Sequence, residues 1–344
     1  MAYEVTIGIP VYNAEKYIRL TMDSALAQTF ESIEFLICDD CGTDSSIDIV
    51  KEYQRFHPRG KDIRIVRQPK NMGIGHGRNR LIDEAQGKYL FFLDADDEIF
   101  PNTISLLYEN AVRYQAEIVY GSRENIEDYE GQQKVTPYVY PSMQFIHKDE
   151  FPSYVYRNYS SIQAQTWNYL IEVDIYRRNH LRFMPVNFWE DFSMTIDLPT
   201  YITRAVLLPD ITYRYYCRYG SLSNFQQRKL IEKEEILKTI DAMAQVKANS
   251  GRIREKGYFP MRLCKVMMTH FYMSCSILKN SDIISPGFSR PEIRDIMRSP
   301  LSLVETMKLK DWRMKNLLLC LLGIFPPIVT VAILRMVGKY KKVI

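Results

Sequence analysis

Cysteine is scarce in this sequence: six residues are spread over 344 positions, without the dense spacing of a disulfide framework. Such sparse cysteines fit a reducing compartment. Cys38 and Cys41 form a C-x-x-C, but no second pair has zinc spacing, so we interpret it as accidental. An internal repeat, a low-complexity tract and a basic N-terminus followed by an apolar signal core are also missing. These absences predict a globular cytoplasmic protein.

Excess positive charge is also missing from most of the chain. The formal net charge is +4, from 45 Lys and Arg against 41 Asp and Glu. Residues 308–344 hold eight basic residues and one acid, Asp311, so this tail carries +7 and the rest about −3. A body without surplus positive charge argues against nucleic-acid binding.

Residues 89–93 form an apolar run that ends abruptly in three acids, Asp94, Asp96 and Asp97. The run is typical of a buried parallel strand, and open α/β sheets bind ligands at the C-terminal ends of such strands. Carboxylates this close repel one another, and a divalent cation would neutralise them. From these residues alone, the alternative is an acidic turn before a helix that begins near Pro101.

Strand-like and helix-like stretches alternate four times in the first ~115 residues, which predicts a doubly wound α/β domain. The expected strands are 5–11, 33–38, 63–66 and 88–93, and the expected helices include 14–28 and one around 47–53. Right-handed crossovers bring the loops at Tyr12, Asp39 and Asp94 to one edge of the sheet.

The glycine-rich stretch 71–79 resembles a dinucleotide fingerprint only superficially, because its spacing is wrong and it follows the third expected strand. It leads into a helix, whose N-terminus could help to hold an anion beside Arg78. An ordinary turn with a helix entry is the alternative.

The second half of the chain is less regular. We expect loops and short strands over 121–160, a helix-like segment to about 180, and strands at 206–208 and 211–216; helices dominate from 228 onward. Glu190 and Asp191 are flanked by aromatic residues, which favours raised pKa values and proton transfer. The alternative is a helix start, where the dipole favours both acids.

Residues 317–334 contain 18 residues without a charge, a borderline length for crossing a membrane. Pro326-Pro327 in the middle would kink or break a helix. Basic residues flank the stretch, so the leading interpretation is a monotopic or re-entrant anchor on an anionic membrane surface. A spanning helix is a weaker interpretation, and a helical pair packed on the globular body is the alternative.

An ordered set of motifs in residues 3–225 resembles the family 2 glycosyltransferases of bacterial cell-surface polysaccharide synthesis, which are inverting enzymes with a GT-A fold. The motifs are I-P-V-Y-N at 9–13, D-D-C-G-T-D at 39–44, an N-x-G…R-N segment at 71–79, a DXD motif at 94–97, W-N-Y-L at 167–170, E-D at 190–191 and Y-R-Y…G-S-x-S at 213–224. Cys41-Gly42 stands where the family usually has Gly-Ser, and Tyr169 replaces a common Lys. The helical tail lies outside the resemblance.

The resemblance implies a Rossmann-like α/β fold, in which a mixed sheet is flanked by helices and a C-terminal helical region follows. It implies a GT-A domain at 1–225, with a nucleotide-sugar half (1–120) and an acceptor-side half (121–225). A helical extension (226–300) and the basic, apolar tail (301–344) follow it. We expect the protein on the cytoplasmic face of the inner membrane, attached peripherally through this tail.

The resemblance also implies an activity: a hexosyl- or N-acetylhexosaminyl-transferase (EC 2.4) that uses Mn²⁺ or Mg²⁺. The donor would be a nucleotide-diphosphate sugar, with a UDP-sugar favoured, and the acceptor a hydroxyl of a glycan or a lipid-linked oligosaccharide. The implied site residues fall into four groups: Pro10, Val11, Tyr12, Asp39, Arg78 and Asp94 for the donor nucleotide, Asp96 for the metal, Asp191 as the general base, and Glu190 and Trp167 for orienting the acceptor or base.

Two other functions stay open. A sugar nucleotidyltransferase shares a similar fold but should carry a glycine-rich basic loop directly after the first strand, where Tyr12 to Glu15 stand here. A non-catalytic, membrane-associated subunit that binds nucleotide sugars is the other; the intact Glu190-Asp191 pair argues against it.

Overall fold

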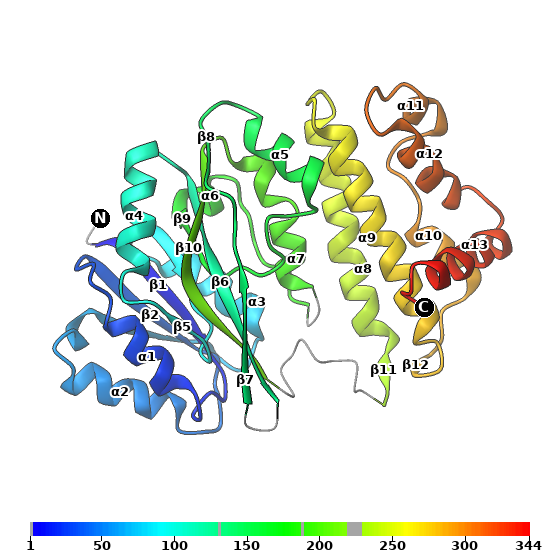
Figure 1. The fold of residues 1–344 in the computed structure, drawn as a ribbon. Helices are drawn as coiled ribbons and strands as arrows, with labels where there is room; N and C mark the ends of the chain where they lie inside the picture. Colours follow the sequence, from blue (N-terminus) through cyan, green and yellow to red (C-terminus); the bar gives the residue numbers. More distant parts are fainter. Residues whose placement is uncertain (1–2, 130–131, 187–188, 219–228) are drawn as a thin grey trace. The chain divides into compact units, whose positions relative to one another are not determined.

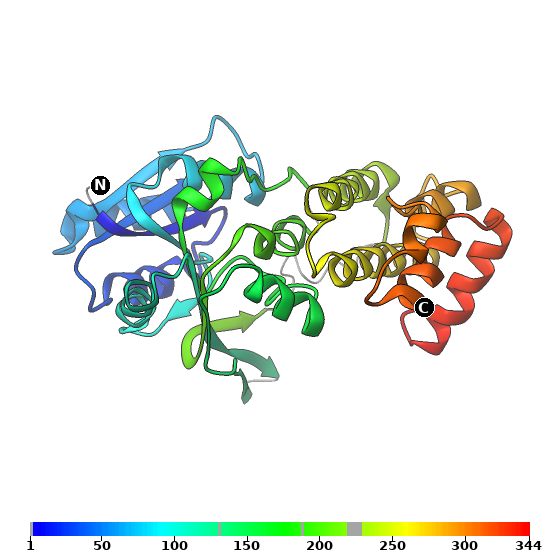
Figure 2. The same cartoon turned by 90° about the horizontal axis from the view of Figure 1, so that it is seen from above.

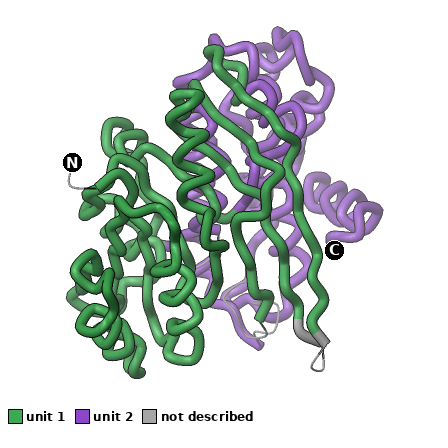
Figure 3. The backbone as a smooth tube through the Cα atoms, turned by 60° about the vertical axis from the view of Figure 1, so that its left-hand side comes forward, with its two compact units in different colours: residues 1–151, 165–185, 201–225 green, residues 152–164, 186–200, 226–344 purple. Residues whose placement is uncertain are grey.

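The computed structural model describes residues 3–129, 132–186, 189–218 and 229–344. The chain forms two compact units (Figure 3), each built from three segments. Unit 1 contains Met1–Phe151, Gln165–Pro185 and Tyr201–Phe225, and unit 2 contains Pro152–Ala164, Val186–Thr200 and Gln226–Ile344. The domain boundaries expected at 225 and 300 stay a prediction.

Unit 1 is built on a mixed sheet that has ten strands among the described residues (Figure 1). Eight of them follow the order β3-β2-β1-β4-β9-β6-β10-β5, while β7 pairs with β6 and β8 with β10. Its first four strands are parallel: β1 (Tyr3–Val11), β2 (Ile33–Asp39), β3 (Ile63–Arg67) and β4 (Gly87–Phe92). The four strands predicted for the first half of the chain are therefore confirmed. The buried, largely apolar sequences of β1, β2 and β4 are those of strands covered on both faces, whereas β3, at the end of the strand order, is only partly buried.

The other half of the sheet is mixed in direction. It contains β5 (Glu98–Ile99), β6 (Ile118–Tyr129), β7 (Gln132–Tyr138), β8 (Met143–Phe145), β9 (Tyr169–Glu172) and β10 (Ala205–Cys217). β9 runs antiparallel to β4, whereas β10 runs parallel to β6. The expected strands 206–208 and 211–216 are one strand, because β10 continues along β6 through register shifts after Leu207.

Helices cover both faces of this sheet (Figure 2). The helices α1 (Ile18–Leu26), α2 (Ser46–Phe56) and α4 (Thr103–Tyr114) contribute to one core cluster with alternate residues of β1 and β2. On the opposite face lie α3 (Ile74–Glu84) and α6 (Val173–Arg178). There Gly8 allows close packing, since an added Cβ would lie 3.3 Å from Leu81 Cδ1. A short 3₁₀ turn, η1 (Gly60–Asp62), precedes β3.

Unit 2 is helical and is organised around α9 (Phe259–Lys279), which is almost wholly buried. α5 (Glu150–Asn158) begins in unit 1 and continues into unit 2. The remaining elements are α7 (Glu190–Thr195), η2 (Leu198–Tyr201), β11 (Ile231–Glu232), α8 (Lys233–Ala248), η4 (Asn249–Ile253), β12 (Ile284–Ser285), α10 (Arg290–Ile296), α11 (Leu303–Met307), α12 (Arg313–Leu322) and α13 (Pro327–Tyr340).

The apolar tail forms two short helices, not one. α12 ends at Leu322 and α13 begins at Pro327, so the predicted break at the proline pair is confirmed. Both helices contact α9: Asn316 Nδ2 donates to Pro260 O at 2.9 Å, and Cys275 Sγ lies 3.8 Å from Leu334 O. Among the residues that the structure describes, no helix is both long and apolar enough to cross a membrane.

Candidate active site

The predicted loops meet at the C-terminal edge of the parallel strands. Asp40 N donates to Val11 O at 3.0 Å, which joins the ends of β1 and β2. Leu93 N donates to Gly8 O at 3.1 Å, which joins the end of β4 to β1. Acidic side chains thus follow β2 and β4, the two strands that flank β1, at the edge where open α/β sheets bind ligands.

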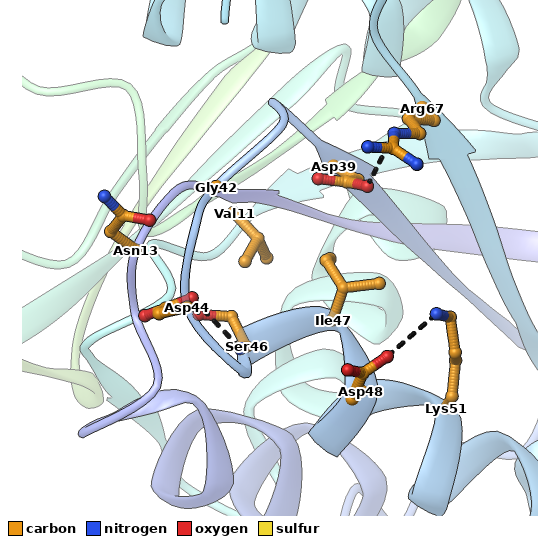
Figure 4. A pocket seen from close by; sticks show the side chains of 10 residues that line it. All are labelled: Val11, Asn13, Asp39, Gly42, Asp44, Ser46, Ile47, Asp48, Lys51 and Arg67. Atoms are coloured by element: carbon orange, nitrogen blue, oxygen red, sulfur yellow. Dashed lines mark hydrogen bonds and ion pairs between the residues drawn. The ribbon is translucent and has the colours of Figure 1, made fainter. Parts of the chain in front are cut away.

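A polar pocket lies beside the end of β2 (Figure 4). Its lining residues are Val11, Asn13, Asp39, Gly42, Asp44, Ser46, Ile47, Asp48, Lys51 and Arg67. Asp39 is buried, and Cys41 N donates to its Oδ1 at 2.9 Å. Its Oδ2 lies 3.4 Å from Arg67 Nε. The pocket therefore contains an oriented acceptor with a cation beside it.

The loop after β2, which contains both departures from the family pattern, is held by hydrogen bonds and close contacts. Cys41 has φ 58°, a left-handed conformation that glycine adopts without strain, and its Sγ donates to Gln68 O at 3.1 Å. At Gly42 an added Cβ would lie 2.9 Å from Asn13 Oδ1. Burial opposes ionisation of Asp44, yet hydrogen bonds from Ser46 and from Glu15 N lower its pKa.

Asp40 orders the neighbouring glycine-rich segment. Its carboxylate accepts hydrogen bonds from Met72 N at 2.8 Å and from Gly73 N at 2.9 Å, directly before α3. Gly73 has φ 85°, a value that a glycine tolerates. The segment that only superficially resembles a dinucleotide fingerprint is thus joined to the loop after β2.

Two arginines pair with Asp94 and Asp96, the acids of the predicted DXD motif. Arg78, which is 1% exposed, places Nη2 3.2 Å from Asp94 Oδ1. Arg218 places Nη1 2.8 Å from Asp96 Oδ2, and its guanidinium lies 4.0 Å from the ring centroid of Tyr17. Burial, together with the neighbouring Asp94, raises the pKa of Asp96. The carboxylate of Asp96 is therefore placed where a cation stabilises it.

Asp97 has a different environment from its two neighbours. It is 1% exposed and accepts hydrogen bonds from Tyr213 OH and Tyr216 N, both at 2.9 Å. Burial, with the nearby Asp96 and Asp94, raises its pKa well above the ordinary value. Asp97 thus fastens the acidic loop to β10, a role that its position in the motif did not suggest.

Asp94 and Asp96 fit a hard divalent cation that takes only one or two of its ligands from the protein. Mg²⁺ is usually held by one or two carboxylates and by substrate phosphates, and Asp94 and Asp96 offer that set. Within the described ranges, no group of three His, Cys, Asp or Glu side chains that could hold a metal comes together.

The other predicted residues are placed as follows. Val11 lines the pocket, Tyr12 is half exposed, and Pro10 pairs with Cys38 in the sheet. Trp167 is buried and stacks on Tyr213, with ring centroids 4.4 Å apart. Its side chain therefore supports β10, and its role toward an acceptor stays a prediction.

Glu190 and Asp191 belong to unit 2, where both lie in the first turn of α7. Trp189, which precedes them, has φ 61°. The helix start proposed as the alternative is therefore present, and it is compatible with a base at Asp191. The last part of the Y-R-Y…G-S-x-S motif, residues 219–224, lies outside the described residues.

Sequence reasoning missed Arg67 and Arg218. Both pair with acids that it singled out, Asp39 and Asp96. Arg218 lies inside the last motif of the family resemblance, so that motif could have indicated it. Arg67 is the last residue of β3, and no motif marks it.

The fold and these loops define a class: an α/β protein with a polar pocket and a paired acidic motif at the edge of a parallel sheet. Within that class, the chain belongs to glycosyl transferase family 2, whose sequence profile matches residues 6–182. The predicted family and the predicted α/β fold are both confirmed.

Several characterised proteins resemble the chain. Glycosyltransferase GlyA of Streptococcus pneumoniae is 28% identical over 263 residues, which cover 74% of this chain and 36% of that protein. Chondroitin synthase of Escherichia coli is 30% identical over 241 residues, 69% of this chain and 32% of the relative. The chain therefore spans about a third of the length of these two relatives.

Solved structures agree on the fold. The crystal structure of S. aureus TarS 1-349 in complex with UDP-GlcNAc has a TM-score of 0.69 at 16% identity. The match covers 95% of this chain and 88% of that one. The similarity therefore extends beyond the residues of the family profile into the helical region.

Proposed function

We propose that this chain transfers a sugar from a UDP-sugar to an acceptor hydroxyl of a growing glycan or a lipid-linked oligosaccharide. The observation that carries the proposal is the pocket around Asp39, which lies in the same unit as the DXD pair Asp94 and Asp96. Family membership supports a transferase, and the UDP-GlcNAc bound to TarS supports a uridine nucleotide.

In this proposal, unit 1 binds the donor. The Asp39 carboxylate accepts a hydrogen bond from the base, while Val11 contacts its face. Arg78 holds the Asp94 carboxylate, which would contact the ribose or help to hold the metal. Mn²⁺ or Mg²⁺ bound at Asp96 would neutralise the charge that develops on the departing diphosphate.

The acceptor step needs a base, for which we propose Asp191. Asp191 removes the proton of the acceptor hydroxyl as its oxygen forms a bond to the anomeric carbon. The bond from that carbon to the diphosphate oxygen breaks, and its electron pair leaves with the UDP. This single in-line displacement inverts the configuration at the anomeric carbon. The departing diphosphate needs no carboxylic acid to protonate it, whereas the leaving group of a glycosidase does.

A donor panel tests the proposal. The full chain is incubated with Mn²⁺ and, separately, UDP-glucose, UDP-galactose, UDP-GlcNAc, UDP-GalNAc and UDP-glucuronate, and UDP release is measured. We expect one or two donors to be turned over, with water as a slow acceptor. A chain that binds UDP by calorimetry but releases none from any donor would instead support the non-catalytic subunit. Pyrophosphate release from UTP and a sugar phosphate would support the nucleotidyltransferase.

Replacing Asp39 with asparagine is expected to weaken UDP binding about 10-fold or more, because a hydrogen bond to a charged group contributes about 1.5–3 kcal/mol. Asp48→Asn is the matched control, since Asp48 lines the same pocket but is exposed and pairs with Lys51 at 2.9 Å. Calorimetric titration with UDP measures both. Equal affinities of Asp39→Asn and wild type would remove Asp39 from the base site.

We also propose that α13 docks on an anionic membrane surface. Its buried residues include Val331 and Leu334, whereas Ile328 and Met336 are 60% and 66% exposed. Lys339, Lys341 and Lys342 lie at its C-terminal end, and no acid follows Asp311. Apolar side chains beside lysines suit an interfacial helix on acidic lipid.

Substituting Ile328 and Met336 together by glutamate is expected to reduce sedimentation with phosphatidylglycerol-containing vesicles at least 10-fold. Point changes are sharper than removing 301–344, because that deletion would uncover α9. Phe56→Glu is the control, since Phe56 is 75% exposed on α2. The proposal would be contradicted if the double variant sedimented as well as wild type, or if the wild-type protein bound neutral and anionic vesicles equally.

A further inference from the structure

A buried ion pair joins two distant parts of unit 2. Arg262 on α9 is fully buried, and its Nη2 lies 2.6 Å from Oδ1 of Asp197, which is 6% exposed. Arg262 also donates to Ser250 Oγ at 2.7 Å and to Val246 O at 3.0 Å. Asn249 Nδ2 donates to Asp197 Oδ2 at 2.9 Å. The helical extension therefore surrounds the Asp197 carboxylate with donors.

Asp197 directly continues the turn that carries Asp191. Ile196 N donates to Phe192 O at 3.0 Å, and Asp197 N donates to Met194 O at 3.1 Å, so the turns of α7 extend to Asp197. Tyr156 OH donates to Ile196 O at 2.8 Å. Whatever holds Asp197 thus also holds the C-terminal end of α7.

α7 depends on such contacts because it is short. It has six residues, and no side chain caps its N-terminus. Helices shorter than about 12 residues are marginal on their own in water, so tertiary packing must set their position. Its aromatic residues Trp189 and Phe192 pack against a core cluster of Ile196, Met243, Val246, Val266 and Met273. Apolar contacts are not directional, so the cluster holds α7 in place without fixing the orientation of the helix. The charged hydrogen bonds at Asp197 are directional and can fix it.

We propose that Arg262 is a positioning residue for sugar transfer: through Asp197 it fixes the short helix that carries Asp191. The inference rests on the proposed function, because it assumes that Asp191 is the base. It makes the helical extension part of the catalytic apparatus, although the family profile ends at residue 182. A base displaced by about 1 Å can cost about 10²-fold in rate.

The test compares Arg262→Gln and Arg262→Lys with Arg254→Gln in the full chain. Arg254 is the matched control, because it pairs with Glu305 at 3.0 Å in the same unit but is exposed. UDP release from UDP-GlcNAc with Mn²⁺ is the first probe, and kcat is normalised to the UDP-binding stoichiometry so that unfolded protein does not count. Hydrogen exchange of residues 189–197 is measured by mass spectrometry.

For Arg262→Gln we expect a 10- to 100-fold fall in kcat, an unchanged KM for the donor, and at least 10-fold faster exchange in 189–197. Arg262→Lys should be intermediate, and Arg254→Gln should match wild type. Wild-type kcat in folded Arg262→Gln, or unchanged exchange in 189–197, would overturn the inference. A merely structural role would lower the binding stoichiometry and leave the normalised kcat alone.

If Arg262→Gln does not fold, the double variant Arg262→Met/Asp197→Asn decides, because it leaves no unpaired buried charge. A folded double variant with wild-type kcat refutes the inference, and one with lowered kcat supports it. If the double variant does not fold either, Arg262→Lys decides by the same criterion. Asp191→Asn is assayed in parallel. Full activity in Asp191→Asn would refute the base itself, whereas lost activity there with wild-type rates in the Arg262 variants would refute only the positioning role.

Discussion

Asp191→Asn is expected to lower kcat for sugar transfer about 10³-fold, while UDP affinity and the KM for the donor stay within twofold of wild type. Asparagine is nearly isosteric with aspartate but cannot accept the proton of the acceptor hydroxyl. General-base catalysis contributes about 10²–10⁴-fold, so removal of the base alone accounts for a loss of this size. The donor is bound by unit 1 in the proposed function, so its affinity should not change.

The measurement is steady-state UDP release from the donor that the panel identifies, with and without an added acceptor. Asp241→Asn serves as the control, because Asp241 is exposed on α8 in the same unit. Thermal unfolding of both variants checks that the fold is intact. If a folded Asp191→Asn variant turned over at the wild-type rate, the general base would have to be another residue, and Glu190 would be tested next.

Local patterns predicted the first half of unit 1 well. Strands buried on both faces read as continuous apolar runs, and right-handed connections bring their C-terminal loops to one edge. The joining of the loops after β1, β2 and β4 therefore followed from short stretches of chain. Some boundaries moved. The largest shift is at α1, which begins at Ile18 and not at Ala14, because Tyr17 N bonds to Ala14 O in a separate turn.

The second half of the sheet was harder to predict because its pairing is non-local. β6 and β7 pair antiparallel over residues that are rich in charge, where loops and short strands were expected. The sequence of β10 suggests a break at Pro209-Asp210, yet the strand pairs with β6 on both sides of the register shift there. In such strands the neighbours decide the conformation, and the segment's own pattern is too weak to do so.

The arginines of the site were missed for the same reason. Arg218 pairs with Asp96 across 122 residues and Arg262 with Asp197 across 65. A sequence identifies acids that end a strand, but it does not indicate which distant cation faces each one. The partners of the carboxylates, and hence much of their electrostatics, appear only once the chain is folded.

Asp96→Asn is expected to lower kcat at least 10³-fold and to remove the dependence of UDP binding on Mn²⁺. Asp96 is the half-buried acid whose pKa is raised by burial and by Asp94, so its carboxylate gains from any cation beside it. In the structure that cation is Arg218. An amide cannot replace a carboxylate as a hard, charged ligand, and the charge on the departing diphosphate would stay uncompensated.

Binding of Mn²⁺ is followed by electron paramagnetic resonance with and without UDP, which gives a readout that does not depend on turnover. Arg218→Gln separates the two cations: it leaves Asp96 in place and frees its carboxylate, so Mn²⁺ should bind more tightly without nucleotide. Asp48→Asn, in the neighbouring pocket, should behave as wild type. Thermal unfolding of the Asp96→Asn variant checks that it is folded. Unchanged Mn²⁺ binding in that variant would assign the metal to other ligands, and Asp94→Asn would then be the decisive comparison.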